Sequence, residues 1–161
     1  MNNKLITALR QTVDALDAET FAYNWNFPNQ CNCGALFCAL TGKTPAELDP
    51  LIPDNGKEQD WTEKVGLFCP ISALPTNELF LELYSYGLTA ADMVNLEYLS
   101  DPRVLAKMTL PVEKKWFKKP KKIQIYDNQK YVAQYMRIWA DILSEEKEVD
   151  KVNLKKEEVY V

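Results

Sequence analysis

The sequence contains no histidine among its 161 residues. Histidine supplies the base of Ser-His-Asp and Cys-His catalysis and is a common ligand of zinc and of non-haem iron. Its absence excludes Ser-His-Asp and Cys-His catalysis, zinc sites with histidine ligands, and iron sites with two histidines and one carboxylate. Glycine is also scarce, and the five glycines form no loop of the kind that cradles phosphates. The sequence therefore favours a protein that is not an enzyme, and we assign no catalytic residue and no cofactor.

Long hydrophobic runs are missing as well. The longest uninterrupted apolar stretch covers residues 34–40, whereas a bilayer-spanning helix needs roughly 20 apolar residues. The first 20 residues mix polar and apolar positions and lack the hydrophobic core of a signal peptide. We therefore expect no transmembrane segment and a cytoplasmic location, where thiols are kept reduced.

The composition is that of a packed globular protein, with 47% hydrophobic and 26% charged residues. A chain of this length fits one domain. We predict a mainly α fold, a compact single-domain bundle of about six short helices with at most a minor two-stranded β element around residues 114–122. The helical domain is expected to cover residues 1–146. Residues 147–161 are charged and lack a core-forming pattern, which predicts a mobile C-terminal tail.

Helical periodicity and capping signals locate the expected helices. Apolar residues at helical spacing predict an amphipathic helix over residues 3–17. Thr44 to Glu47 and Thr89 to Asp92 have the spacing of capping boxes. Asn32 is expected to cap a buried helix that Gly42 ends, and the last helix is expected to run to about residue 146. Every second residue in the range 21–27 is aromatic. This range is expected to be an extended segment or a short strand.

Three of the four cysteines lie close together in the stretch NQCNCGALFC, residues 29–38. Four thiols are enough for a tetrathiolate zinc site, but Cys-x-Cys spacing differs from the Cys-x(2–4)-Cys pairs of structural zinc sites. The metal-ligand candidates are Cys31, Cys33 and Cys69, and Cys38 is expected to be a core residue. A thiol in the first turn of a helix has its thiolate stabilised by the helix N-terminus. Thiolate metal binding or thiol redox chemistry at Cys31 and Cys33 is therefore one alternative function.

A basic strip at residues 114–122, KKWFKKPKK, contrasts with the rest of the chain. It holds six lysines and no acidic residue, whereas residues 1–113 hold 7 basic and 15 acidic residues. Lysines attract phosphates and aromatic rings stack on bases or settle at a lipid surface. Binding of a polyanion, either nucleic acid or anionic lipid, is thus a second alternative function. Its candidate residues are Lys114, Lys115, Trp116, Phe117, Lys118, Lys119, Lys121 and Lys122.

The last predicted helix carries an aromatic stripe formed by Tyr131, Tyr135 and Trp139. Such stripes usually belong to the core, but any part left exposed would mark an interface. With no catalytic constellation in the chain, we favour a non-catalytic protein that acts through protein contacts. Its partner is expected to be another protein or a second copy of the chain in a homodimer, and nucleic acid is not the favoured partner.

Overall fold

The computed structural model describes residues 3–27, 29–48, 76–110 and 125–159. These residues contain seven α-helices and no strand, which confirms the predicted mainly α fold. The expected β element falls largely on residues 111–124, outside the described residues. The helices are α1 (Asn3–Asp17), α2 (Asn32–Thr41), α3 (Pro45–Leu48), α4 (Thr76–Ser85), α5 (Ala90–Tyr98), α6 (Pro102–Leu105) and α7 (Gln129–Val159).

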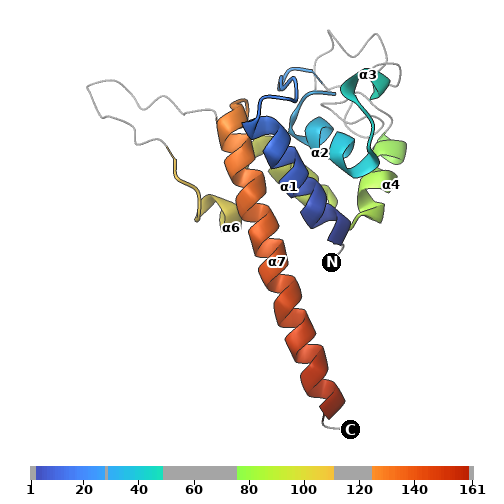
Figure 1. Ribbon diagram of the computed structural model, residues 1–161, viewed down its shortest axis with the longest axis vertical. Coiled ribbons are helices and arrows are strands. Elements are labelled where there is room, and N and C mark those ends of the chain that lie inside the picture. The colour runs from blue at the N-terminus through green and yellow to red at the C-terminus, as the bar shows by residue number, and fades with distance from the viewer. Residues whose placement is uncertain (1–2, 28, 49–75, 111–124, 160–161) are drawn as a thin grey trace, which may run out of the picture.

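The first and last helices pack side by side along the middle of the molecule (Figure 1). Each is amphipathic, so their apolar stripes bury each other and form the centre of the core. From α1 this core takes Leu5, Leu9, Val13 and Leu16, and from α7 it takes Val132, Met136, Trp139 and Leu143.

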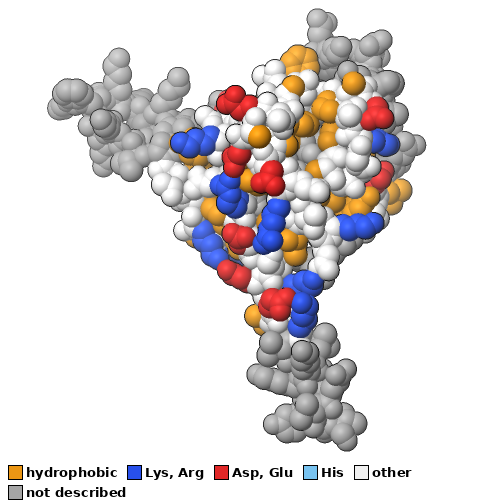
Figure 2. All heavy atoms as spheres, viewed as in Figure 1, with side chains coloured by type: hydrophobic (Ala, Val, Ile, Leu, Met, Phe, Trp, Pro, Cys, Tyr) orange, Lys and Arg blue, Asp and Glu red, His pale blue; other side chains and the backbone are white. Residues whose placement is uncertain are grey.

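Polar pairs line the edge of the α1–α7 seam. The guanidinium of Arg10 lies 3.5 Å from the carboxylate of Asp141, and Arg137 forms an ion pair with Asp17. Side chains of both charge signs are interspersed on this face (Figure 2). The side chain of Lys147 donates to Asn3, the first residue of α1. The start of α1 therefore lies level with this point of α7.

Helix α2 has no exposed residue and packs on α1 and α5. Its N-cap is Cys31, whose sulfur accepts a hydrogen bond from the Gly34 N–H, and not Asn32 as expected. The helix ends as predicted at Gly42, which has a φ of 73°. This left-handed conformation suits glycine because it has no Cβ to clash with the backbone.

The capping signals mark real helix starts. Thr44 and Glu47 bond each other at the start of α3, and Thr89 and Asp92 form a full capping box at α5. Residues 21–27 form neither helix nor strand. The chain turns at residues 24–27, where the Phe27 N–H donates a hydrogen bond to the Asn24 carbonyl at 3.1 Å. The segment is therefore not extended throughout.

Helix α7 differs most from expectation. It continues to Val159 instead of ending near residue 146, and the part of it beyond α1 extends away from the packed helices (Figure 1). Lysine and glutamate dominate this part, and both favour helix without needing a core. We call residues 148–159 the α7 extension. The predicted mobility of residues 147–161 stays a prediction.

Candidate functional site

A buried amide, Asn32, joins four segments at the start of α2. Its side chain is 0% exposed. Its Oδ1 accepts a hydrogen bond from the Tyr23 hydroxyl at 2.8 Å. Its Nδ2 donates to the backbone carbonyls of Glu97 at 2.9 Å, of Tyr126 at 3.1 Å and of Leu96 at 3.2 Å. One side chain thus satisfies carbonyls at the end of α5 and in the turn before α7, which water cannot reach easily.

Glu97 lies beside Asn32 and is also 0% exposed. Its Oε2 accepts a hydrogen bond from the Cys33 N–H at 3.1 Å, in the first turn of α2. Within the described part of the chain its Oε1 has no hydrogen bond. Burial raises the pKa of Glu97 to about 7, while the Cys33 N–H and the side chains of Cys33, Cys31 and Trp25 favour the ionised form and limit the rise. We call Asn32, Glu97, Cys31, Cys33 and Tyr23 the polar junction.

The three cysteines of this stretch differ in their surroundings. Cys31, Cys33 and Cys38 are thiols and not disulfides. Cys33 is half-buried, and its thiol donates to the Met93 carbonyl at 3.5 Å. Cys38 is a core residue, as predicted, and burial with the nearby Glu47 raises its pKa to about 11. Cys33 is therefore the better placed of these two thiols for reaction with an outside molecule.

Metal binding finds no support in the described residues, which contain no group of three or more Cys, Asp or Glu side chains that could hold an ion. Cys69 lies outside the described residues, so a site that includes it stays a prediction. The basic strip at residues 114–122 also lies outside them, and its binding of a polyanion stays a prediction too.

The aromatic stripe of α7 belongs mostly to the core. Tyr135 and Trp139 are 1% and 3% exposed, and their rings meet at 6.4 Å. The Tyr135 hydroxyl accepts a hydrogen bond from the Asp101 N–H at 3.1 Å. Tyr131 is half-buried and packs against the core. Tyr135 and Trp139 are thus buried in the core, and an interface role for the stripe stays a prediction.

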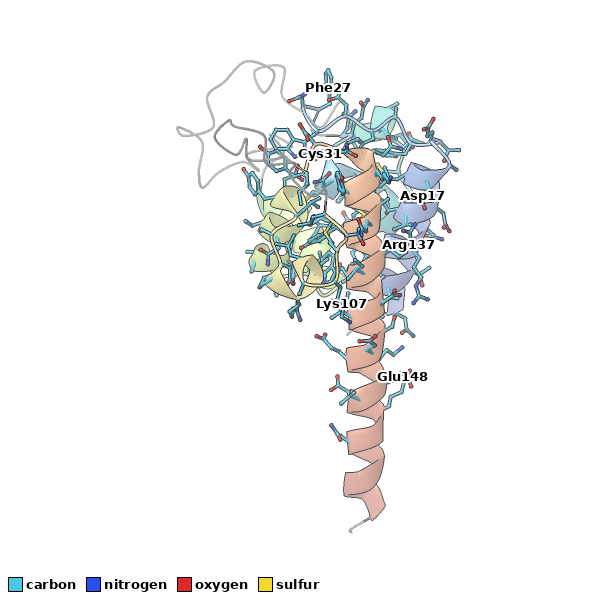
Figure 3. All side chains as sticks on the ribbon, turned by 90° about the vertical axis from the view of Figure 1, so that its left-hand side faces the viewer. Asp17, Phe27, Cys31, Lys107, Arg137 and Glu148 are labelled. Carbon is cyan, nitrogen blue, oxygen red and sulfur yellow. The ribbon has the colours of Figure 1, made fainter. Side chains whose placement is uncertain are left out.

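A partly exposed aromatic cluster covers the polar junction. The ring of Tyr126 lies 4.7 Å from that of Trp25 and 5.7 Å, edge-on, from that of Tyr98. Tyr98 and the nearby loop residue Phe27 are 41% and 45% exposed. In Figure 3, Phe27 and Cys31 lie together at the end of the molecule opposite to the α7 extension.

Sequence reasoning missed a groove between α6 and α7. It has a volume of about 450 Å³ and lies where α7 leaves the packed helices. Its apolar lining residues are Ile142, which is 7% exposed, and Val149, which is 58% exposed. Its rim carries both charge signs, and it is lined by Arg103, Lys107, Ile142, Glu145, Glu146, Val149 and Asp150. A valine in a charged helical segment was the signal available in the sequence.

Ion pairs connect the α6 side of this groove with α7. Arg103 bonds Asp101 at 2.7 Å and Glu146 at 2.9 Å. The Nζ atom of Lys107, which is labelled in Figure 3, lies 3.4 Å from Oε2 of Glu145. The hydrogen bonds from Arg103 hold the pKa of Asp101 below its ordinary value. The groove is thus lined mainly by charged side chains of both signs, with Ile142 and Val149 as its apolar residues.

The chain matches no known protein family, no curated protein and no solved structure. No helix in the described ranges combines the length and the hydropathy that crossing a membrane requires.

Proposed function

We propose that the protein acts through protein contacts made by the α7 extension and the groove at its base. The observation that carries this proposal is the exposure of Val149, which is 58% accessible on a helix that has left the packed helices. All five side chains described in the extension, Glu148, Val149, Asp150, Lys151 and Asn153, are exposed.

Helix energetics support this proposal. The extension spans 12 residues, and isolated helices shorter than about 12–15 residues are marginally stable in water. Its Lys151–Glu148 ion pair is exposed, so it adds little stability. A partner that covered Val149 would stabilise the extension and bury apolar surface. Leu81 and Val94 are also exposed, but α4 and α5 pack on the core with their other faces.

The groove adds the second element of a contact surface. Ile142 and Val149 are two helical turns apart and share it. The groove thus lies where the packed part of α7 passes into the extension. We further place the protein in the cytoplasm, in keeping with the thiols of Cys31, Cys33 and Cys38.

Site-specific photo-cross-linking in living cells tests this proposal. A photoreactive amino acid in place of Asn153, on the extension, is expected to give a discrete protein adduct. The same amino acid in place of Asp14, which is exposed on α1, is expected to give none. A Val149→Asp change should remove the adduct from position 153. Absence of any adduct at 153, or equal adducts from both positions, would contradict the proposal.

A second candidate function is thiol–disulfide exchange at Cys33, whose backbone N–H and side chain both interact with the buried carboxylate of Glu97. In this reaction the Cys33 thiolate attacks one sulfur of a small disulfide and forms a mixed disulfide. The other sulfur leaves as a thiolate. Glu97 accepts the Cys33 proton and returns it to the leaving thiolate. A carboxyl group with a pKa of about 7 suits this role because its acid strength approaches that of a thiol.

Exchange with oxidised glutathione tests the second candidate. Mass spectrometry is expected to find the mixed disulfide on Cys33 and not on Cys38, whose pKa is raised to about 11. Glu97→Gln should slow the reaction at Cys33 at least tenfold at pH 7, as expected for loss of a general base. Equal rates for the wild type and Glu97→Gln would remove Glu97 from the reaction, and a Cys33 as slow as Cys38 would remove the function.

A further inference from the structure

We propose that Cys31 and Cys33 form a reversible disulfide with each other, in exchange with a low-molecular-weight disulfide such as oxidised glutathione. This inference rests on the second candidate function, thiol–disulfide exchange at Cys33, because it names the thiol that completes that reaction. The product is then a cross-link within the chain and not a lasting adduct. The side chains of both cysteines interact with one buried carboxylate, that of Glu97, and this shared contact carries the inference.

The backbone holds the two cysteines at a separation that a disulfide can span. Cys31 is the N-cap of α2, and Asn32, the first residue of the helix, is the one residue between the two cysteines. Two residues that flank one helical residue have Cα atoms about 5.4 Å apart, given the rise and radius of an α-helix. Disulfides join residues whose Cα atoms are about 4.4–6.8 Å apart. The backbone separation therefore permits the bond.

The two thiols converge on Glu97. The Cys33 N–H donates to its Oε2 at 3.1 Å, and the side chains of Cys31 and Cys33 both interact with the carboxylate. A carboxylate is only a few ångströms across, so two sulfur atoms that both contact it lie near each other. Its Oε1 makes no hydrogen bond within the ranges that the structure describes, so this oxygen is available to take a thiol proton.

Exposure assigns a different role to each thiol. Cys33 is half-buried, whereas Cys31 is 0% exposed. Of this pair, only Cys33 can be reached by a disulfide from solution, so Cys33 is the attacking thiol. Cys31 can react only with a sulfur already inside the polar junction, such as the Cys33 sulfur of the mixed disulfide. Cys31 is therefore the resolving thiol.

The reaction balances with one molecule of oxidised glutathione. The Cys33 thiolate attacks one of its sulfurs, the S–S bond breaks, and one glutathione leaves as a thiolate. The Cys31 thiolate then attacks the Cys33 sulfur of the mixed disulfide, and the second glutathione leaves. In each step Glu97 takes the proton of the attacking thiol and returns it to the leaving thiolate. The two protein thiols are oxidised to one disulfide, and oxidised glutathione is reduced to two thiols.

The expected product is a switch and not a permanent cross-link. A disulfide that closes over one intervening residue constrains the unfolded chain little, so it adds little stability. Excess reduced glutathione is therefore expected to open it again. Oxidation also removes both thiol protons near Glu97, which leaves its carboxylate with fewer donors where α5 meets the first turn of α2. The redox state of the pair thus affects the contact between these two helices.

A time course by intact mass spectrometry of the folded full chain tests this inference. In a small excess of oxidised glutathione, the wild type is expected to gain one glutathione on Cys33 early and then to lose it with a net loss of two hydrogens. Cys31→Ser is expected to keep the glutathione, at a final level at least about tenfold above that of the wild type, because the neighbouring resolving thiol is gone. Serine is a favoured N-cap residue, so this variant should keep α2, which circular dichroism checks.

Further variants assign the bond. A chain with Cys38→Ala and Cys69→Ser retains only Cys31 and Cys33, and it is expected to lose two hydrogens as the wild type does. Adding Cys33→Ser to that chain should abolish both the adduct and the loss of hydrogens, because Cys31 is buried. Fragmentation of the wild-type tryptic peptide over residues 11–43 locates the bond without any substitution. Reduced glutathione should restore both thiols.

Three results would overturn this inference. They are an adduct on Cys33 that persists equally in the wild type and in Cys31→Ser, a disulfide that joins Cys33 to Cys38 or Cys69 instead, and a bond that excess reduced glutathione does not open. Each of them leaves thiol–disulfide exchange at Cys33 standing. Absence of any reaction at Cys33 would remove both the pair and the second candidate function.

Discussion

The carboxylate of Glu97 accepts a hydrogen bond from the backbone N–H of Cys33 at 3.1 Å, and this bond joins α5 to the first turn of α2. The carboxylate is fully buried in a chain without histidine. Few other groups in such a chain titrate between pH 5 and 8. The titration of Glu97 can therefore be followed with little interference from other titrating groups.

Folding stability should depend on pH through Glu97. Its pKa is about 7 in the folded protein against an ordinary value of 4.5. The folded state thus keeps a proton that the unfolded state loses, so the stabilisation is present below pH 4.5 and is lost as the pH rises through 7. We expect the free energy of unfolding to fall by about 3 kcal/mol between pH 5 and 8. Urea unfolding at several pH values measures this fall.

Glu97→Gln provides the control for that measurement. Glutamine keeps an acceptor for the Cys33 N–H but has no proton to lose, so its unfolding free energy should be nearly flat over the same range. Glu47 and Asp101 have lowered pKa values, and their contribution is lost only in more acidic solution. Parallel curves for the wild type and the variant would show that Glu97 is not the titrating group.

Asn32→Ala should be strongly destabilising. The change leaves the Glu97 carbonyl without its side-chain donor and removes one hydrogen bond each from the Tyr23 hydroxyl and the carbonyls of Leu96 and Tyr126. These last three groups keep one partner each, since Tyr23 still bonds Tyr126 and the Leu99 N–H still donates to Leu96. We expect a loss on the order of 3 kcal/mol, because buried polar groups left without partners carry their full desolvation cost. Asn26→Ala, at an exposed position, should change stability by less than about 0.5 kcal/mol. Equal losses in a denaturant titration would refute the special role of Asn32.

Tyr135→Phe should lower stability more than Tyr131→Phe. The Tyr135 hydroxyl accepts the Asp101 N–H in a buried position, and phenylalanine leaves that N–H without an acceptor. A loss of about 1–2 kcal/mol is expected. Tyr131 is half-buried, so water can reach the site and loss of its hydroxyl should lower the stability little. Thermal unfolding of the two variants gives the comparison, and a larger loss at Tyr131 would contradict it.

Gly42→Ala should cost about 1–2 kcal/mol, since an L-residue is strained in the left-handed region. No atom lies within 4 Å of the added Cβ, so the cost is conformational and not steric. Gly42→Asn should cost less, because asparagine tolerates this conformation. Denaturant unfolding of both variants tests the order, and an alanine variant as stable as the wild type would exclude strain at this position.

Local signals predicted much of the fold. The helix over residues 3–17, the capping boxes at Thr44 and Thr89 and the terminal Gly42 depend on neighbours within a few residues, so the sequence displays them directly. The end of α7 was missed for the opposite reason. The charged segment lacks a core pattern, and local helix propensity, not burial, carries the helix to Val159.

The polar junction depends on distant segments and was harder to predict. Asn32 bonds residues 64 to 94 positions away, and no local pattern reveals such contacts. The sequence did hold one signal. Glu97 lies four residues after Met93, a helical spacing that puts the carboxylate on the buried face of α5. A charged residue on an apolar face calls for a tertiary partner.

The pairing of α1 with α7 also governs when the protein can fold during its synthesis. Helix α1 is synthesised before α7, with Leu5, Leu9 and Leu16 buried on a helix that packs mainly against α7. Helix α7 follows α1 by more than 110 residues, so the nascent chain carries this apolar face without its α7 partner until α7 has been made. The core therefore closes after synthesis of α7, and a chain that stopped before it would offer chaperones the surface of α1.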